Sequence, residues 1–217
     1  MKKLLALALA GTMTLSLAAC GGSKADTTTA AETTETTDTA DAASTDGQTY
    51  TVGICQLVQH EALDAATQGF KDAIVEALGE DNVTFEEQNA SGDSATCATI
   101  INQLVSDNVD LILANATPAL QAAAQGTDTI PVLGTAVTEY GVALDIDNFD
   151  GLVGTNVSGT SDLAPLDQQA AMLNELFPDA KNVGLLYCSA EANSQYQVDT
   201  VQAALEDLGY TCKQYSF

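Results

Sequence analysis

The sequence predicts an α/β protein built on doubly wound parallel sheets. From residue 49 onward, short runs of β-branched and apolar residues alternate with longer stretches that carry apolar residues at helical spacing. This alternation is typical of a parallel sheet with helices on both faces. The run VDLILANA at 109–116 is hydrophobic without alternation, as expected of a central strand in such a sheet. Right-handed crossovers then make the sheet doubly wound.

The strands of the first part are short apolar runs, expected at residues 49–58, 82–90, 109–116, 130–138 and 152–159. The helices between them are expected at residues 60–79, 91–108 and 117–126. The first helix ends at Gly79, and Asp93 or Ser94 caps the second. In the third helix Thr117 is the expected cap, and Pro118 takes the first helical position.

The alternation restarts after these elements, with a helix, a strand, a helix and the start of a strand expected at residues 166–177, 182–189, 194–209 and 210–215. The sequence stops at Phe217 within this repeat. We therefore expect a second lobe that is incomplete in this chain, and favour a fragment over an abnormally small lobe. The expected division is 49–157 for the first lobe and 158–217 for the start of the second.

Residues 1–20 have the layout of a secretory signal: MKK, a short apolar run, and small residues before a cysteine. The run is too short and too interrupted to favour a transmembrane helix. Cys20 follows Leu-Ala-Ala and resembles the bacterial lipobox, whose cysteine is lipidated; an incidental cysteine after a plain signal is the alternative. A lipid there would anchor the chain without spanning the membrane. Residues 21–48, rich in Thr, Ala, Asp and Glu, predict a disordered tether.

The composition limits the partners. The formal net charge is −24, with 6 basic against 30 acidic residues. Binding to nucleic acid needs clustered Lys and Arg, so no nucleic-acid partner is expected. Docking on anionic lipid is disfavoured for the same reason. A zwitterionic ligand remains compatible with this charge.

No motif points to catalysis, a metal or a cofactor. His60 is the only histidine, and no Ser-His-Asp or Cys-His arrangement is assembled around it. Glycine-rich nucleotide motifs are absent, so no cofactor is expected. Four further cysteines lack C-x-x-C spacing, which argues against zinc: Cys55, Cys97, Cys188 and Cys212. Buried thiols are favoured for most of them, and disulfides outside the cell stay open.

Ligands of open parallel sheets bind beyond the carboxyl ends of the strands. The segments expected there are rich in hydroxyl and amide groups, which suits a small neutral or zwitterionic ligand: 56–60, 89–93, 115–118, 135–140 and 188–194. The helix that begins at Pro118 would offer free N–H groups to a carboxylate, unless Thr117 merely caps its own helix. Glu191 would suit an ammonium group, unless its segment is a solvated turn.

Six segments, in this order, resemble the substrate-binding lipoproteins of ABC importers: VGICQLVQHEALDAATQGFKDAI, QNASGDSAT, ANATPALQAAA, IPVLGTAVT, VSGTSDLAP and NVGLLYCSAEANS. The resemblance runs from about Tyr50 to the last residue and is closest to the branch associated with tryptophan, tyrosine or related aromatic amino acids. It implies a type I periplasmic-binding-protein fold, with two Rossmann-like lobes that close on a ligand by hinge motion. Glu139 and Tyr140 depart from the Asp-Pro that family members often carry there.

The resemblance implies that the chain captures a small zwitterionic solute, an aromatic amino acid, and delivers it to a membrane permease. A sensory module that signals to a membrane receptor is the alternative, followed by a surface enzyme. The ligand contacts that the resemblance implies are Gln56, Thr117, Thr138, Asp162, Ser189, Glu191, Asn193 and Ser194.

Overall fold

A computed structural model describes residues 47–217. The expected signal peptide with Cys20, and the expected tether as far as residue 46, lie outside the described residues. Within residues 47–217, no helix is both long enough and apolar enough to cross a membrane.

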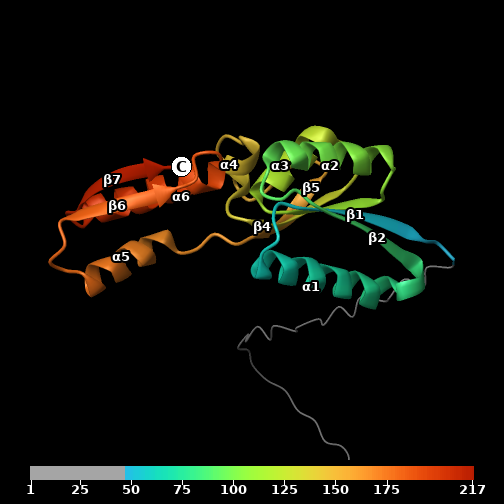
Figure 1. Ribbon diagram of the computed structural model, residues 1–217, viewed down its shortest axis with the longest axis horizontal. Helices are drawn as coiled ribbons and strands as arrows, with labels where there is room; N and C mark the ends of the chain where they lie inside the picture. Colours follow the sequence, from blue (N-terminus) through green and yellow to red (C-terminus); the bar gives the residue numbers. More distant parts are fainter. Residues whose placement is uncertain (1–46) are drawn as a thin grey trace, which may run out of the picture. The chain divides into compact units, whose positions relative to one another are not determined.

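The first sheet has five parallel strands in the order β2-β1-β3-β4-β5 (Figure 1). The strands are β1 (Tyr50–Gln56), β2 (Val83–Asn89), β3 (Leu111–Asn115), β4 (Val132–Val137) and β5 (Val157–Ser161). In β3 every residue but the first is buried. The expectation of a central strand within residues 109–116 is thus confirmed.

Helices cover both faces of this sheet. α1 (Glu61–Leu78) lies on one face, and α2 (Ser94–Ser106) and α3 (Thr117–Gly126) lie on the other (Figure 1). Side chains of β1 and β3 form the core beneath α1: Val52, Ile54 and Leu113. The larger core beneath α2 and α3 includes Cys55, Cys97, Ile101, Leu104, Ile112 and Leu120. This confirms the doubly wound arrangement that the sequence predicts.

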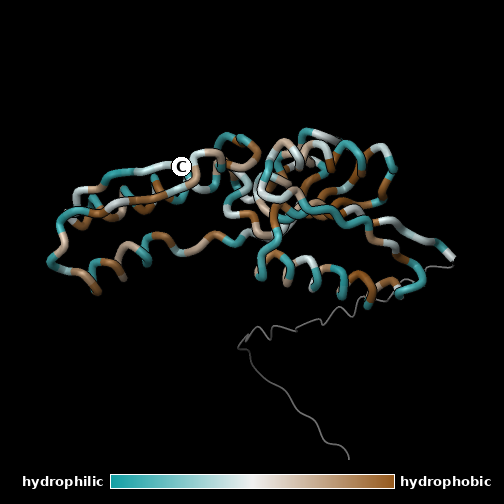
Figure 2. Tube along the Cα trace, viewed as in Figure 1, coloured by the Kyte–Doolittle hydropathy of each residue, from teal (hydrophilic) through white to brown (hydrophobic). Residues whose placement is uncertain are grey.

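The helix ends follow local sequence signals. The His60 ring nitrogen Nδ1 accepts a hydrogen bond from the backbone N–H of Ala62 and caps α1, which ends at Gly79 with φ of 88°. A 3₁₀ turn, η1 (Glu80–Asn82), leads into β2. Asp93 caps α2 by accepting from the N–H of Ala95. Hydrophilic and hydrophobic residues alternate along α1 in Figure 2, as expected of a helix with one face on a sheet.

The fifth strand starts later than the sequence predicts. An extended segment is expected at 152–159, but β5 spans Val157–Ser161. Gly151 and Gly154 have φ of 97° and 74°, so the chain before β5 turns instead of extending. The side-chain amide of Asn156 then donates to two carbonyl groups in the turn before β4, at 3.0 and 2.7 Å, and fixes where the strand begins.

The predicted start of α3 is also wrong. Thr117 is expected to cap the helix, but it is the first helical residue, and Ala116 occupies the capping position. Ala116 has φ of 90°, so the chain turns sharply there and the helix begins one residue early. The side chain of Thr117 therefore makes no capping hydrogen bond.

One helix is missed by the sequence reasoning. α4 (Tyr140–Leu144) is a five-residue helix directly after β4. The Glu139 carboxylate caps it, accepting from the N–H groups of Gly141 at 3.0 Å and Val142 at 2.6 Å. A helix of this length is too short to show a helical period in sequence.

The second sheet pairs β6 (Asn182–Tyr187) with β7 (Thr211–Ser216) in parallel. Its helices are α5 (Leu166–Leu176) and α6 (Ala192–Asp207), and its core contains Ala170, Leu205 and Tyr210. The helix–strand–helix–strand order is as predicted. β6 ends two residues before the predicted 189 and α6 begins two before the predicted 194, so the turn between them keeps its length and lies two residues earlier.

Leu104 is expected to be essential for stability. It is fully buried, and its side chain fills the space above Gly53 of β1. Leu104→Ala should lower the free energy of unfolding by about 2–5 kcal/mol, because it removes apolar contacts and leaves a cavity. Urea denaturation followed by circular dichroism measures this. Leu208→Ala, at a residue that is 46% exposed, should cost under about 1 kcal/mol; equal losses would contradict this packing.

Candidate ligand-binding site

The strand order reverses between β1 and β3. The chain steps from β1 outward to β2, then crosses to β3 on the other side of β1. In open α/β sheets, ligands bind in the crevice outside the carboxyl ends of the strands at this switch point. Gln56 ends β1 and Asn115 ends β3, and the two residues are partners in the ladder.

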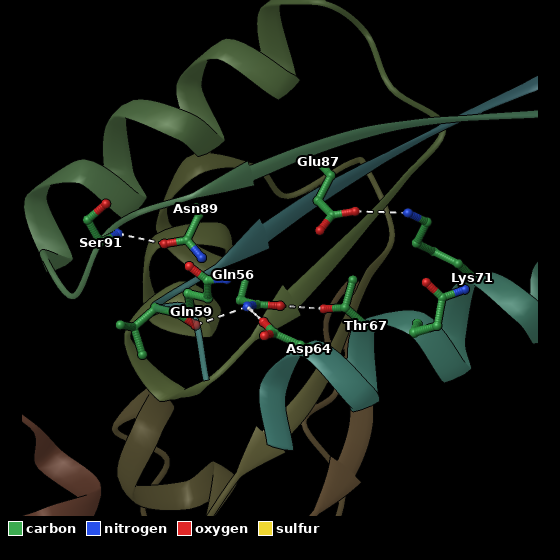
Figure 3. Close-up of a pocket in the computed structure, with 10 residues that line it drawn as sticks. Gln56, Gln59, Asp64, Thr67, Lys71, Glu87, Asn89 and Ser91 are labelled. Atoms are coloured by element: carbon green, nitrogen blue, oxygen red, sulfur yellow. Dashed lines mark hydrogen bonds and ion pairs between the residues drawn. The ribbon is translucent and has the colours of Figure 1, made fainter. Parts of the chain in front are cut away.

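A buried hydrogen-bond network holds these two strand ends. The Nδ2 of Asn115 donates to the Thr67 hydroxyl at 2.9 Å and lies 3.4 Å from the Gln56 Oε1, and the Thr67 hydroxyl donates to that same oxygen at 2.7 Å. The Nε2 of Gln56 donates to the Asp64 carboxylate at 2.6 Å and to the Val58 carbonyl at 2.9 Å (Figure 3). Both hydrogens of the Gln56 amide and its oxygen are thereby used.

A cavity of about 750 Å³ lies beside this network, between α1 and the ends of β1 and β2. Gln56, Asp64 and Thr67 line it on one side (Figure 3). Lys71 and Glu87 form an ion pair of 2.9 Å across it. Since both partners are partly exposed, this pair contributes little to stability.

The N-terminus of α3 carries unused hydrogen-bond donors. Thr117 is only 2% exposed, and its hydroxyl has no partner among the described residues. The backbone N–H groups of Thr117 and Ala119 likewise donate to no group of residues 47–217, while Leu120 already donates to Ala116. The helix dipole adds a partial positive charge here. This arrangement suits a carboxylate.

Tyr140 fixes the end of β4. Its hydroxyl donates to the Gly134 carbonyl at 3.0 Å and lies 3.3 Å from the Thr160 carbonyl. Gly134 and Gly159 leave the room for it, since a Cβ at either would collide with the Tyr140 oxygen. Burial, and secondarily the nearby Asp162 carboxylate, raise the pKa of Tyr140 to about 12. Glu139 and Tyr140, which depart from the family pattern, therefore have separate roles. Glu139 caps α4, and the Tyr140 hydroxyl links β4 to β5.

Two other predicted contacts lie near Tyr140. Thr138 follows β4 and is buried; its hydroxyl lies 3.4 Å from the Gln197 amide, and its carbonyl accepts from Ser161. Asp162 follows β5, is exposed, and donates its backbone N–H to the Val137 carbonyl.

The remaining predicted contacts gather at the junction of β6 and α6. Ser189 is exposed and donates to the Phe217 carbonyl at 3.2 Å. Glu191 occupies the N-cap position of α6 but makes no side-chain capping bond. Asn193 and Ser194 lie in the first turn of α6, and the Oδ1 of Asn193 is buried with no partner among the described residues. Ser194 also lines a second cavity of about 310 Å³.

Sequence reasoning named Gln56 but missed the residues around it. Asn115 falls within the expected segment 115–118 but is not among the expected ligand contacts, and Thr67 and Asp64 are not expected at the site at all. Asn115 carried a usable signal, because an amide that ends a continuous apolar strand is buried and must find partners. Thr67 and Asp64 gave no such signal, since both belong to the polar pattern of an ordinary amphipathic helix.

Residues 51–216 match the family described as ABC transporter substrate binding protein. The chain belongs to this family. Its proteins bind solutes and are not enzymes, and the chain has their type I periplasmic-binding-protein fold.

The chain is similar to the tyrosine-binding protein of Clostridioides difficile strain R20291, at 37% identity over 92% of this chain and 56% of that protein. It is similar to a crystal structure of an ABC domain from Streptococcus pneumonia in complex with L-Trp, with 34% identity and a TM-score of 0.73. It also resembles a conserved domain protein of Vibrio cholerae, with 31% identity and a TM-score of 0.72. The chain covers 58% of each of these two structures, and 78% of this chain is matched.

Thr67→Val tests the buried network. Valine has the shape of threonine but removes one donor and one acceptor, so the free energy of unfolding should fall by about 1–3 kcal/mol. Urea denaturation measures the loss. Thr99→Val is the matched control, because the Thr99 hydroxyl is exposed and bonds only to the Ala95 carbonyl. The control should change stability by less than about 0.5 kcal/mol; an equal loss in both would contradict the role of Thr67.

Tyr140→Phe should destabilise the fold by about 1 kcal/mol at neutral pH, through loss of the hydroxyl hydrogen bond. The folded-state pKa, about 12, lies above the unfolded value of roughly 10. The contribution of the neutral phenol is therefore complete below pH 10 and is lost as the pH rises toward 12. Denaturant unfolding of the unmodified protein and of Tyr140→Phe from pH 8 to 11 gives both free energies of unfolding. The difference between them should shrink as the pH rises. Tyr215→Phe, at a residue that is 49% exposed, should show no such convergence.

Proposed function

We propose that this chain forms ligand-binding surfaces of an extracytoplasmic lipoprotein of an ABC importer, which captures a zwitterionic aromatic amino acid and delivers it to a membrane permease. The observation that carries the proposal is the N-terminus of α3. There the buried Thr117 hydroxyl and the neighbouring N–H groups, at the sheet's switch point, have no partner among the described residues. Buried polar groups without partners are rare in proteins, and a ligand carboxylate would satisfy these.

The charge of the chain supports recognition by neutral donors. The sequence has no arginine, and only Lys71, Lys181 and Lys213 lie in residues 47–217. Lys71 is already paired with Glu87. A carboxylate at the switch point would therefore be held by N–H and hydroxyl groups, with the helix dipole in place of a cation.

The ammonium group is assigned to the junction of β6 and α6. Glu191 supplies a carboxylate there, and the buried Oδ1 of Asn193 is an acceptor without a partner among the described residues. We propose Ser189 and Ser194 as further contacts on this side. Thr138 and Asp162 are proposed to lie at the margin of the site.

Gln56 is proposed to act as a positioning residue. Its amide hydrogens and its oxygen are taken by Asp64, Val58, Thr67 and Asn115, so little capacity remains for a ligand. Its role would be to hold the end of β1 next to the end of β3, and so to fix the turn that leads to Thr117.

The choice of an aromatic amino acid is supported by similarity. One relative is named a tyrosine-binding protein, and a similar structure holds L-Trp. The signal-like residues 1–20 with Cys20, and the acidic tether at 21–48, support attachment to the outer face of a membrane. Such an anchor would hold the protein near its permease at a high effective concentration.

Thr117→Val tests the proposal. The protein is produced from Gly21 to the stop codon of its gene, and tyrosine and tryptophan binding are measured by calorimetry. The affinity should fall about 10- to 100-fold, since a hydrogen bond to a charged group is lost. Stability without ligand should be unchanged, because the Thr117 hydroxyl bonds to nothing in the described chain.

Thr99→Val again serves as the control and should bind normally. Native mass spectrometry of the unmodified protein shows whether an amino-acid-sized ligand co-purifies. Normal binding by Thr117→Val would place the carboxylate elsewhere. An unmodified protein that binds no amino acid would overturn the proposed function.

A further inference from the structure

We propose that Cys55 and Cys97 form a disulfide bond that ties β1 to the first turns of α2. Formation of this bond in the living cell rests on the extracytoplasmic location proposed above, because structural disulfides persist in oxidising compartments. The structure holds both residues as thiols. They differ from the other described cysteines, Cys188 and Cys212, which are partly exposed.

The packing of α2 on β1 brings the two residues together. Leu104 of α2 lies against Gly53 of β1, where an added Cβ would stand 2.8 Å from the leucine Cδ1. Cys55 is two residues after Gly53 and so points to the same face of the sheet. Cys97 is seven residues before Leu104, which is two helical turns and the same helix face. Since α2 runs back along the sheet, these offsets place Cys97 over Cys55.

The burial of both residues agrees with this placement. Both side chains have no exposed surface and belong to the same core. The proximity of the two thiols raises the pKa of Cys55 and lowers the pKa of Cys97, because the S–H of Cys55 stabilises a thiolate on Cys97.

The oxidant is a disulfide, either of a small thiol or of a protein. The Cys97 thiolate attacks one sulfur of that disulfide, forms a mixed disulfide and releases one thiolate. The Cys55 thiolate then attacks the Cys97 sulfur and releases the second. The two protons lost by the cysteines go to the two released thiolates. Because both residues are buried in the folded chain, exchange takes place before α2 packs on β1.

The bond would lock the ligand-facing edge of the sheet. Cys55 immediately precedes Gln56, the end of β1, and Cys97 follows the loop at 89–93 closely. That loop already donates backbone hydrogen bonds from Ala90 and Gly92 to the carbonyls of Gln56 and Leu57. A covalent link here would keep β1, the loop and α2 together.

A tryptic digest without reductant tests the bond on unmodified protein. Trypsin cuts after Lys24, Lys71 and Lys181, so Cys55 and Cys97 fall in the separate peptides 25–71 and 72–181. After refolding with oxidised glutathione, the two peptides should appear as one mass that dithiothreitol separates. Separate peptides, or peptide 25–71 joined to any other cysteine peptide, would overturn the proposal.

Thermal unfolding gives an independent readout. The oxidised protein should melt about 10 °C higher than the reduced protein, because the bond closes the chain between β1 and α2. The Cys55→Ala/Cys97→Ala double variant should lose this response to dithiothreitol, whereas Cys188→Ser should keep it. Equal melting temperatures for oxidised and reduced protein would overturn the proposal. Amino-acid binding, measured in both redox states, reports on the proposed function separately.

Discussion

The hydrogen-bonded amides of Gln56 and Asn115 are the interaction on which the ligand-facing edge of the first sheet depends. Parallel strands all end at one edge, so β1 and β3 bring their last side chains together. Both amides are almost fully buried, and without partners they would each cost a large desolvation penalty. α1 supplies the partners through Thr67, Asp64 and the Leu63 carbonyl. The sheet edge and α1 are therefore held as one unit.

Thr117 differs from the two strand ends in its hydrogen bonding. Gln56 and the amide nitrogen of Asn115 are satisfied within the chain, whereas Thr117, two residues on, is buried with no partner among the described residues. The positive φ of Ala116 separates the two environments, because it turns the chain from strand into helix in a single residue. The Oδ1 of Asn115 is likewise buried with no partner among the described residues, so two unsatisfied groups lie next to a well-held strand end. Unsatisfied groups on a held framework are what a preorganised binding site requires.

The sequence predicts the order of elements well and their boundaries less well. Strand and helix positions follow hydrophobic period and capping residues, which are local properties, and Gly79 and Asp93 end and begin helices as expected. The start of β5 and the helix α4 escape prediction, because glycine conformations and a five-residue helix leave no period. The Thr117 cap is wrong for a similar reason, since a positive φ at an alanine has no signature in sequence. Of the site, residues beyond strand ends are predictable, but the helical partners Thr67 and Asp64 depend on the packing of α1.

The N-terminus of α3 and the β6–α6 junction contribute different groups to the proposed site. The N-terminus of α3 offers donors, from N–H groups and a hydroxyl, while Glu191 and the Asn193 oxygen at the β6–α6 junction add acceptors. The donors at α3 alone would leave the ammonium group of a zwitterion without an acceptor. In the proposed function an amino acid therefore gains its full set of hydrogen bonds only when both junctions contact it. A ligand that binds the closed arrangement better than the open one shifts the population toward closure by that difference in affinity. An isolated carboxylate or amine lacks one of the two sets of contacts, so it would favour closure less than an amino acid does.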